Sequence, residues 1–306
     1  MEKVDYDLVI IGGGPAGLTA GMYAARARLN VLLVEKVVPG GQILITDWIE
    51  NYPGFPEGIS GPDLTDKMVE QAKQFDLKIE STEVLSMDLE GSVKTLKLDR
   101  GEIKTRTVII ASGAAPRTLH VGEEKFHGKG LSYCATCDGP FFRDKVVVAV
   151  GGGDTAVQES IYLTKFAKKV YLVHRRDQLR ATKILQERAF ENEKIEFVWD
   201  SVLTGVDGLF GIESVSVKNV KTGEESTIQA NGCFIWVGLI PNTGFTGDAL
   251  ELDEWGFIKT NANMETSIPG VFAAGDVRET PLRQIATAVG DSAIAALSAE
   301  HYIENL

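Results

Sequence analysis

Short apolar runs recur along the chain, and each is followed by glycines and then by a stretch with helical periodicity. Residues 7–11 read Asp-Leu-Val-Ile-Ile and precede three glycines, and residues 146–150 read Val-Val-Val-Ala-Val and precede three more, at an offset of 139 residues. Second apolar runs follow at residues 31–34 and 170–173, again 139 residues apart. A strand, a glycine turn, a helix and a second strand form a βαβ unit, so the sequence predicts two such units.

The hydrophobic pattern outside these units predicts further elements. Residues 60–76 carry an apolar stripe at helical spacing, and the alanine-rich tail from residue 283 to residue 303 has the same period. Alternating stretches near residues 79–110 and 195–235 predict antiparallel strands. The apolar run at residues 108–116, which closes the first half, is echoed at residues 234–241 in the second. The two halves therefore resemble each other beyond the glycine turns.

Two short segments, residues 113–116 and 241–244, combine glycine and proline and are candidate hinges. We therefore predict an α/β fold made of two Rossmann-like (three-layer ββα) dinucleotide-binding domains, the second inserted into the first. The first domain would comprise residues 1–115 and 245–306, and the inserted domain residues 116–244.

Composition narrows the class of protein. The 306 residues include 31 Lys and Arg against 43 Asp and Glu, a net charge of −12, which repels nucleic-acid phosphates and anionic membranes. No apolar run approaches the roughly 18 residues of a membrane span, and the first seven residues lack the basic start of a signal peptide. We expect a cytoplasmic protein that binds neither nucleic acid nor membrane. Three cysteines are too few for a disulfide-stapled secreted scaffold.

The first glycine turn has the spacing of a dinucleotide site. Gly12, Gly14 and Gly17 permit a tight turn, close approach of a pyrophosphate and close packing of helix on strand, while the helix start offers free N–H donors. Glu35 ends the second strand 23 residues after Gly12, where a carboxylate accepts both hydroxyls of an adenosine ribose. The alternative is a tight turn without a ligand.

The second turn, with Gly151, Gly153 and Ala156, is followed by the opposite charge. His174 stands where Glu35 stands in the first unit, and three arginines follow it: Arg175, Arg176 and Arg180. Guanidinium groups pair bidentately with phosphate oxygens, so this strand end favours a 2′-phosphorylated ribose and hence NADP(H) over NAD(H). The alternative is a solvated basic patch.

Cys134 and Cys137 stand three residues apart and are followed by Asp138. Cysteines at this spacing can form a small disulfide, and a nearby helix start or cation can lower the pKa of one thiol. Asp138 is placed to exchange a proton with a leaving thiolate. Structural zinc would need two more ligands, and the chain has no second closely spaced pair, so we expect no metal. Cys233, inside an apolar run, reads as a buried small hydrophobe.

Residues 269–276 read as a short buried strand that ends in Gly-Asp. The carboxylate of Asp276 would there bond the ribityl or ribose hydroxyls of a cofactor held by the first turn. An Asp that closes a turn is the alternative.

Taken together, these motifs resemble the low-molecular-weight thioredoxin reductases over essentially the whole chain. The specific markers are Cys-Ala-Thr-Cys-Asp, His-Arg-Arg-x-x-x-Arg and Ala-Gly-Asp-Val. The resemblance implies a homodimeric flavoprotein in which NADPH reduces FAD, FAD reduces the Cys134–Cys137 disulfide, and this pair reduces thioredoxin. It further implies that Cys137 faces the flavin, that Cys134 attacks the thioredoxin disulfide, and that Asp138 is the acid/base.

The resemblance also assigns binding positions. Those for FAD are Gly12, Gly14, Gly17, Glu35, Gly41, Gln42, Asn51, Val84, Asp276, Arg283 and Gln284. Those for NADPH are Gly151, Gly153, Thr155, His174, Arg175, Arg176 and Arg180. The chain departs from the family pattern at Asp154, which would place a negative charge near a pyrophosphate, and at Gln158, where a Glu is more usual.

The nicotinamide site and the cysteine pair fall in the inserted domain, whereas the flavin site falls in the other. We therefore expect the inserted domain to rotate about residues 113–116 and 241–244 between half-reactions. Three rival interpretations remain: a flavin disulfide reductase with another donor, such as ferredoxin, or another protein disulfide as partner; a non-catalytic redox-sensing module; and an NADP oxidoreductase without dithiol chemistry.

Overall fold

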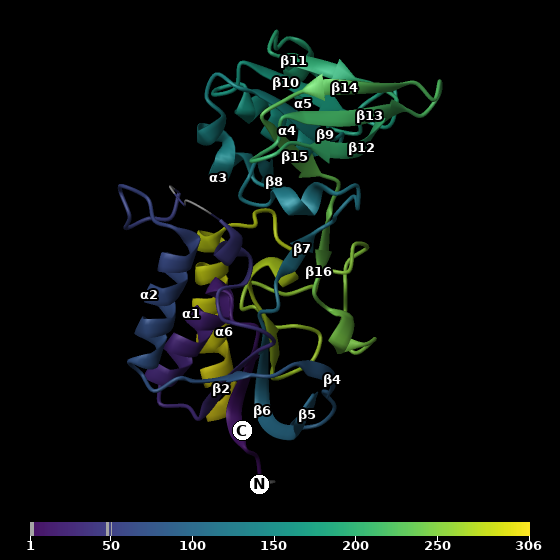
Figure 1. Cartoon of the computed structure of the whole chain (residues 1–306). Coiled ribbons are helices and arrows are strands. Elements are labelled where there is room, and N and C mark those ends of the chain that lie inside the picture. The colour runs from purple at the N-terminus through teal and green to yellow at the C-terminus, as the bar shows by residue number, and fades with distance from the viewer. Residues whose placement is uncertain (1–2, 47–48, 50) are drawn as a thin grey trace. The chain divides into compact units, whose positions relative to one another are not determined.

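The computed structural model describes residues 3–46, 49 and 51–306 (Figure 1). The chain divides into two compact units. Unit 1 consists of Met1–Thr46, Tyr52–Ala115 and Ile240–Leu306, and unit 2 consists of Pro116–Leu239 together with Asp47–Asn51. Each unit is built around its own sheet and its own hydrophobic clusters.

Unit 1 contains a seven-stranded sheet with β1 (Tyr6–Ile11) near its centre. The strand order is β3-β2-β1-β6-β5-β4, and β17 also pairs with β6. Strands β1, β2, β3, β6 and β17 pair with one another in parallel, whereas β5 pairs antiparallel with both β4 and β6. Their bounds are β2 (Val31–Glu35), β3 (Lys78–Ser81), β4 (Val84–Asp88), β5 (Lys94–Leu98), β6 (Gly101–Ile110) and β17 (Val271–Ala273).

The antiparallel prediction for residues 79–110 is right for β4 to β6 and wrong for β3. Strand β3 pairs in parallel with β2 because helix α2 precedes it as a crossover. Alternation of polar and apolar residues shows that a strand is exposed on one face, as an edge strand often is, but it does not fix the strand's direction.

Three helices of unit 1, α1 (Pro15–Arg26), α2 (Gly61–Lys73) and α6 (Ile285–Glu304), lie together beside the sheet in Figure 1. Ser60 caps α2 by accepting the Asp63 N–H at 3.1 Å. Helix α1 contacts both α2 and α6, and the buried faces of α1 and α6 are rich in alanine, which lets them approach closely. Short 3₁₀ turns follow at Gly41–Ile45 (η1), Gly244–Thr246 (η4) and Gly275–Val277 (η5).

Unit 2 contains a five-stranded parallel sheet of order β11-β10-β9-β15-β8 and an antiparallel sheet of order β12-β13-β14. The parallel strands are β8 (Leu131–Ser132), β9 (Val146–Gly151), β10 (Lys169–Val173), β11 (Ile195–Val198) and β15 (Gly232–Trp236). The antiparallel strands are β12 (Ser201–Asp207), β13 (Ser214–Asn219) and β14 (Glu225–Gln229). The antiparallel prediction for residues 195–235 is thus wrong for β11 and β15, which continue the parallel sheet.

The two faces of β9 show the three layers of this unit. Val147 and Ala149 pack in a cluster with α4 (Asp154–Leu163) and α5 (Lys183–Phe190), whereas Val148 and Val150 pack in a cluster with β12 and β13. Because side chains alternate along a strand, β9 is buried on both faces, which explains its uninterrupted apolar run. The remaining short helical elements are η2 (Glu123–Phe126), α3 (Ala135–Asp138) and η3 (Gly139–Phe142).

The chain enters and leaves unit 2 through two short strands, β7 (Ala114–Pro116) and β16 (Leu239–Pro241), which pair with each other. Next to them the backbone N–H of Asn242 donates to the carbonyl of Gly113 at 2.9 Å. The Ser112 hydroxyl donates to the Asn242 carbonyl at 2.7 Å, and the Asn242 amide donates to the Ser112 carbonyl at 2.8 Å. The two linking segments therefore form a hydrogen-bonded ribbon.

None of the helices within the described part of the chain combines the length and the apolar character that crossing a bilayer requires.

Candidate functional site

The first glycine turn joins β1 to α1 and leaves no room for a side chain at Gly12 or Gly17. A Cβ at Gly12, where φ is +106°, would lie 2.4 Å from the Ala111 carbonyl oxygen, and a Cβ at Gly17 would lie 1.8 Å from the Gly12 carbonyl oxygen. At Gly14, in contrast, a Cβ would meet only the Cα of Gly41, at 4.0 Å. The start of α1 is thus open above Gly14, as a pyrophosphate requires.

Glu35 binds the turn itself. One carboxylate oxygen accepts the Gly13 N–H at 2.7 Å, and the other accepts the Val37 N–H at 3.1 Å. Each oxygen retains a second lone pair, so the carboxylate can hold the loop and still accept ribose hydroxyls. The residues present therefore fit an adenosine diphosphate moiety at this end of unit 1.

The other predicted FAD residues are distributed over unit 1 and the segment 47–51. Val84 is buried at the start of β4, and Gln284 caps α6 in a reciprocal arrangement with Thr287. Arg283 stacks on the Phe257 ring at 4.0 Å, which fixes its guanidinium. Gly41, Gln42 and Asn51 are exposed; Asn51 adjoins residue 50, which lies outside the described residues.

Asp276 is a carboxyl group held away from water. It lies in η5, directly after the buried strand β17. Burial raises the pKa of Asp276 from 3.8 to about 6; the nearby Arg283 opposes this shift, and Asp291 adds to it. A desolvated carboxylate needs hydrogen-bond donors, and the hydroxyls of a ribityl chain would supply them.

In the flavin-free protein, this carboxyl group should make stability depend on pH. Because its pKa rises on folding, the folded state binds more protons than the unfolded chain between about pH 3.8 and 6, so stability falls as pH rises through this window. We expect this group to lower the free energy of unfolding of the wild type by about 2 kcal/mol between pH 4.5 and 7.5. Asp276→Asn should not show this decrease. Urea unfolding of both flavin-free proteins at these two pH values measures it, and equal pH dependence in the two would contradict the prediction.

The second glycine turn, in unit 2, is also tightly packed. A Cβ at Gly151 would lie 2.5 Å from the Ala156 Cβ. The carbonyl of Gly152 accepts the backbone N–H of Arg180 at 2.7 Å, which ties the loop after β10 to the turn. The arginine-rich loop and the start of α4 are therefore held together by the backbone.

The four basic residues after β10 differ in exposure. Arg175, Arg176 and Arg180 are exposed, whereas His174 is only 5% exposed and its ring lies against Gly152. Burial lowers the pKa of His174, and the three arginines add to this effect. Its Nε2 atom has no hydrogen-bond partner among the residues that the structure describes. Three exposed cations beside a buried imidazole whose pKa is lowered suit an anionic phosphate group.

The negative charge of Asp154, next to the second glycine turn, has a hydrogen-bond partner. Its carboxylate accepts the Thr182 N–H at 2.6 Å, just before α5 begins. The negative charge is thereby used at a helix start, where it is favourable. Thr155, which also lies in the first turn of α4 and is a predicted NADPH residue, is exposed.

Cys134 and Cys137 form a disulfide with a Cα–Cα distance of 5.4 Å. Cys134 is the N-cap of α3, and Asp138 is the last residue of this helix. The Ser132 hydroxyl donates to the Asp138 carboxylate, and its oxygen accepts the Cys134 N–H at 3.1 Å. The pair and the adjacent acid are therefore held by one short segment. The third cysteine, Cys233, is fully buried in β15, and burial raises the pKa of its thiol to about 12.

Two residues of this region were not predicted from the sequence. Ser132 positions Asp138, and Glu159 of α4 accepts the Ala135 N–H at 3.1 Å. A serine before a cysteine motif carries no specific signal. Glu159 lies 24 residues from its partner, so only the packing of α3 on α4 reveals it.

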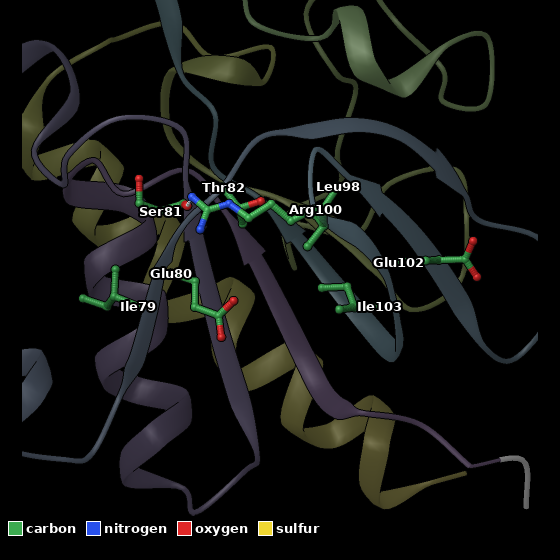
Figure 2. A pocket seen from close by; sticks show the side chains of 8 residues that line it. All are labelled: Ile79, Glu80, Ser81, Thr82, Leu98, Arg100, Glu102 and Ile103. Carbon is green, nitrogen blue, oxygen red and sulfur yellow. Dashed lines mark hydrogen bonds between the residues drawn. The ribbon is translucent and has the colours of Figure 1, made fainter.

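A separate hollow of about 450 Å³ opens in unit 1 (Figure 2). It lies beside β3 and the β5–β6 hairpin, and the Arg100 guanidinium crosses it to donate to the Ser81 carbonyl at 2.6 Å. The residues that line it are Ile79, Glu80, Ser81, Thr82, Leu98, Arg100, Glu102 and Ile103. No predicted site residue lines this hollow, so it belongs to neither glycine turn.

Comparison with known proteins agrees with these features. The family model described as pyridine nucleotide-disulphide oxidoreductase matches residues 6–292. The thioredoxin reductase of Peptoclostridium acidaminophilum is 48% identical over 99% of this chain and 98% of its own length, and that of Bacillus subtilis (strain 168) is 48% identical over 100% and 96%. The crystal structure of thioredoxin reductase from Streptococcus pyogenes matches with a TM-score of 0.91 at 50% identity, over 98% of this chain and 99% of that one.

The chain therefore belongs to the pyridine nucleotide-disulphide oxidoreductase family, whose members use a flavin and a pyridine nucleotide. The identity to thioredoxin reductases over essentially the whole chain makes it an oxidoreductase of the thioredoxin reductase class, with the two-domain dinucleotide-binding fold.

Proposed function

We propose that the chain transfers electrons from NADPH bound by unit 2, through FAD bound by unit 1, to the Cys134–Cys137 disulfide and then to a thioredoxin-like protein. The observation that carries this proposal is the disulfide itself, closed across the start of α3 and next to a positioned carboxyl group. When bound, the flavin supplies the two-electron carrier that links a hydride donor to a disulfide.

The exchange with the protein substrate would use this chain's own atoms. The Cys134 thiolate attacks one sulfur of the substrate disulfide, a mixed disulfide forms, and the second substrate sulfur leaves and takes up a proton. Cys137 then loses its proton and attacks Cys134, which restores the internal disulfide and releases the substrate's other sulfur as a thiol. Asp138, held by Ser132, would donate and accept protons in these steps.

The coenzyme would bind across the second glycine turn. The pyrophosphate would lie at the start of α4, near Gly151, Gly153 and Thr155, and the 2′-phosphate would pair with the exposed Arg175, Arg176 and Arg180. The buried His174 would form the wall behind them through its contact with Gly152. The charge of Asp154, bonded to Thr182, opposes this binding less than a free carboxylate would.

In the first domain, Glu35 would bind the adenosine ribose of FAD, and Asp276 would accept from its ribityl hydroxyls. We propose residues 1–115 and 245–306 as the FAD domain and residues 116–244 as the NADPH domain, with rotation of the second about the ribbon of β7 and β16. These bounds differ from those of units 1 and 2 at residues 47–51 and 240–244. A crosslink that joined the two domains and left turnover unchanged would contradict the rotation. The homodimer and the cytoplasmic location implied by the family belong to the same proposal.

Anaerobic titration of the flavin-loaded protein with NADPH tests the electron path. Two acceptors in series, the flavin and the Cys134–Cys137 disulfide, should take up four electrons per FAD, whereas a flavin without dithiol chemistry takes up two. An equal titration with NADH serves as the control for the coenzyme. Uptake of only two electrons would contradict the proposed function and favour an NADP oxidoreductase without dithiol chemistry. No bleaching by NADPH would also contradict it and favour a redox-sensing module or another electron donor.

A further inference from the structure

Glu159 of α4 lies against the start of the helix that carries the disulfide. Its Oε2 atom accepts the Ala135 N–H at 3.1 Å, and the nearby Thr136 amide also favours the charged form of its carboxylate. Ala135 is fully buried and Glu159 is half-buried, so water screens this contact only partly. Ala135 is peptide-bonded to Cys134. The carboxylate charge therefore lies beside the cysteine that is proposed to attack the substrate.

The backbone N–H groups of α3 are divided between this carboxylate and Cys134. The Cys137 N–H points to the Cys134 sulfur at 3.2 Å, and the Asp138 N–H donates to the Cys134 carbonyl at 3.1 Å. Of the remaining two, the Ala135 N–H donates to Glu159, and the Thr136 N–H favours the charged form of the same carboxylate. Amides at a helix start ordinarily stabilise the thiolate of an N-terminal cysteine and lower its pKa. Here a carboxylate competes with Cys134 for these two amides.

We propose that Glu159 is a positioning residue that keeps the Cys134–Cys137 pair strongly reducing, because its charge and its bond to the Ala135 amide disfavour a thiolate at Cys134. This inference rests on the proposed redox role of the pair. Reduction breaks the Sγ–Sγ bond, adds two electrons and, with two protons, yields two thiols. A group that stabilises the thiolate draws the equilibrium towards the reduced pair and makes the disulfide a stronger oxidant. A carboxylate beside the thiolate has the opposite effect, which suits a donor of electrons.

Partial burial of the Glu159 carboxylate costs free energy, because its charge loses contact with water. Burial raises the pKa of Glu159, and the amides of Ala135 and Thr136 act against that rise. A neutral glutamine would accept the Ala135 N–H bond at a lower cost of desolvation. The negative charge, rather than the hydrogen bonds alone, is therefore the property to test.

The test compares the wild type with Glu159→Gln, which keeps an acceptor oxygen and removes the charge. Each flavin-loaded protein is equilibrated in dithiothreitol redox buffers at pH 7 and at pH 9.5, and its free thiols are counted by alkylation and mass spectrometry. We expect the equilibrium constant to shift towards the reduced pair in Glu159→Gln, by up to about tenfold where Cys134 is ionised, since a charge this close shifts a pKa by about one unit. That factor corresponds to about 30 mV. Iodoacetamide should also alkylate Cys134 several-fold faster in the reduced variant.

Two further variants separate charge from structure. Glu159→Asp keeps the charge and should retain the wild-type equilibrium, and Glu193→Gln removes an exposed carboxylate of the same unit and should change nothing. An unshifted Glu159→Gln, or an equal shift in Glu159→Asp, would overturn the inference. If the wild type takes up four electrons per FAD, such a result leaves the proposed function standing. A wild type that takes up only two electrons overturns both.

Discussion

Replacing Cys134 with serine should reduce the rate of thioredoxin reduction by at least about 10³-fold, since a hydroxyl neither forms the internal disulfide nor attacks an external one. NADPH should still bleach the flavin in this variant, because neither glycine turn is altered. Turnover is measured with thioredoxin coupled to insulin reduction, and flavin bleaching is measured by stopped-flow absorbance.

Cys137→Ser should lose turnover to a similar degree but should differ in one respect. Its Cys134 thiol can still attack the substrate, and no second thiol remains to resolve the mixed disulfide. A covalent complex with thioredoxin should therefore accumulate in Cys137→Ser and not in Cys134→Ser. Cys233→Ala, which changes a buried thiol outside the pair, is the matched control and should remain active. Retained turnover in either serine variant, or complex formation by Cys134→Ser, would contradict the assigned roles.

The second large effect concerns the coenzyme. Replacing Arg175 and Arg176 together with alanine should lower kcat/KM for NADPH by about 10²- to 10⁴-fold and leave kcat/KM for NADH nearly unchanged. Each charge-assisted bond to a phosphate contributes about 1.5–3 kcal/mol, and two such bonds account for this range. Initial rates of flavin reduction with both coenzymes measure the change.

Arg188→Ala provides the control for net charge, because Arg188 is an exposed arginine of the same unit at the end of α5. It should leave the preference for NADPH intact. An equal loss with NADPH and NADH in the double variant would show that the arginines support the fold of the loop rather than bind the 2′-phosphate.

The sequence predicted the features of this protein that depend on local pattern. The two βαβ units follow from uninterrupted apolar runs and glycine spacing, and the structure confirms both as β1-α1-β2 and β9-α4-β10. The contact of Glu35 with the first turn was not predicted as such, but its place at the end of β2 was.

Features that depend on packing could not be predicted from the pattern. Strands β3 and β11 alternate as antiparallel strands do, yet the helices before them make them parallel. The sequence around Ser132 and Glu159 carries no specific signal, and only their contacts with α3 in the folded chain indicate a role. His174 aligns with Glu35 in the internal repeat, but its ring is buried against Gly152 while the arginines after it are exposed. The two equivalent positions therefore differ in role: Glu35 accepts a hydrogen bond from the first glycine turn, whereas His174 packs against the second.

The burial of Cys233 has a practical consequence for anyone who follows this protein over time. A thiol with no exposed surface and a pKa near 12 carries almost no reactive anion at neutral pH, so maleimides and iodoacetamide should pass it by while the chain stays folded. Labelling of the folded chain should therefore modify no sulfur when the Cys134–Cys137 disulfide is closed and two when it is reduced. Modification of a third sulfur identifies molecules that have unfolded.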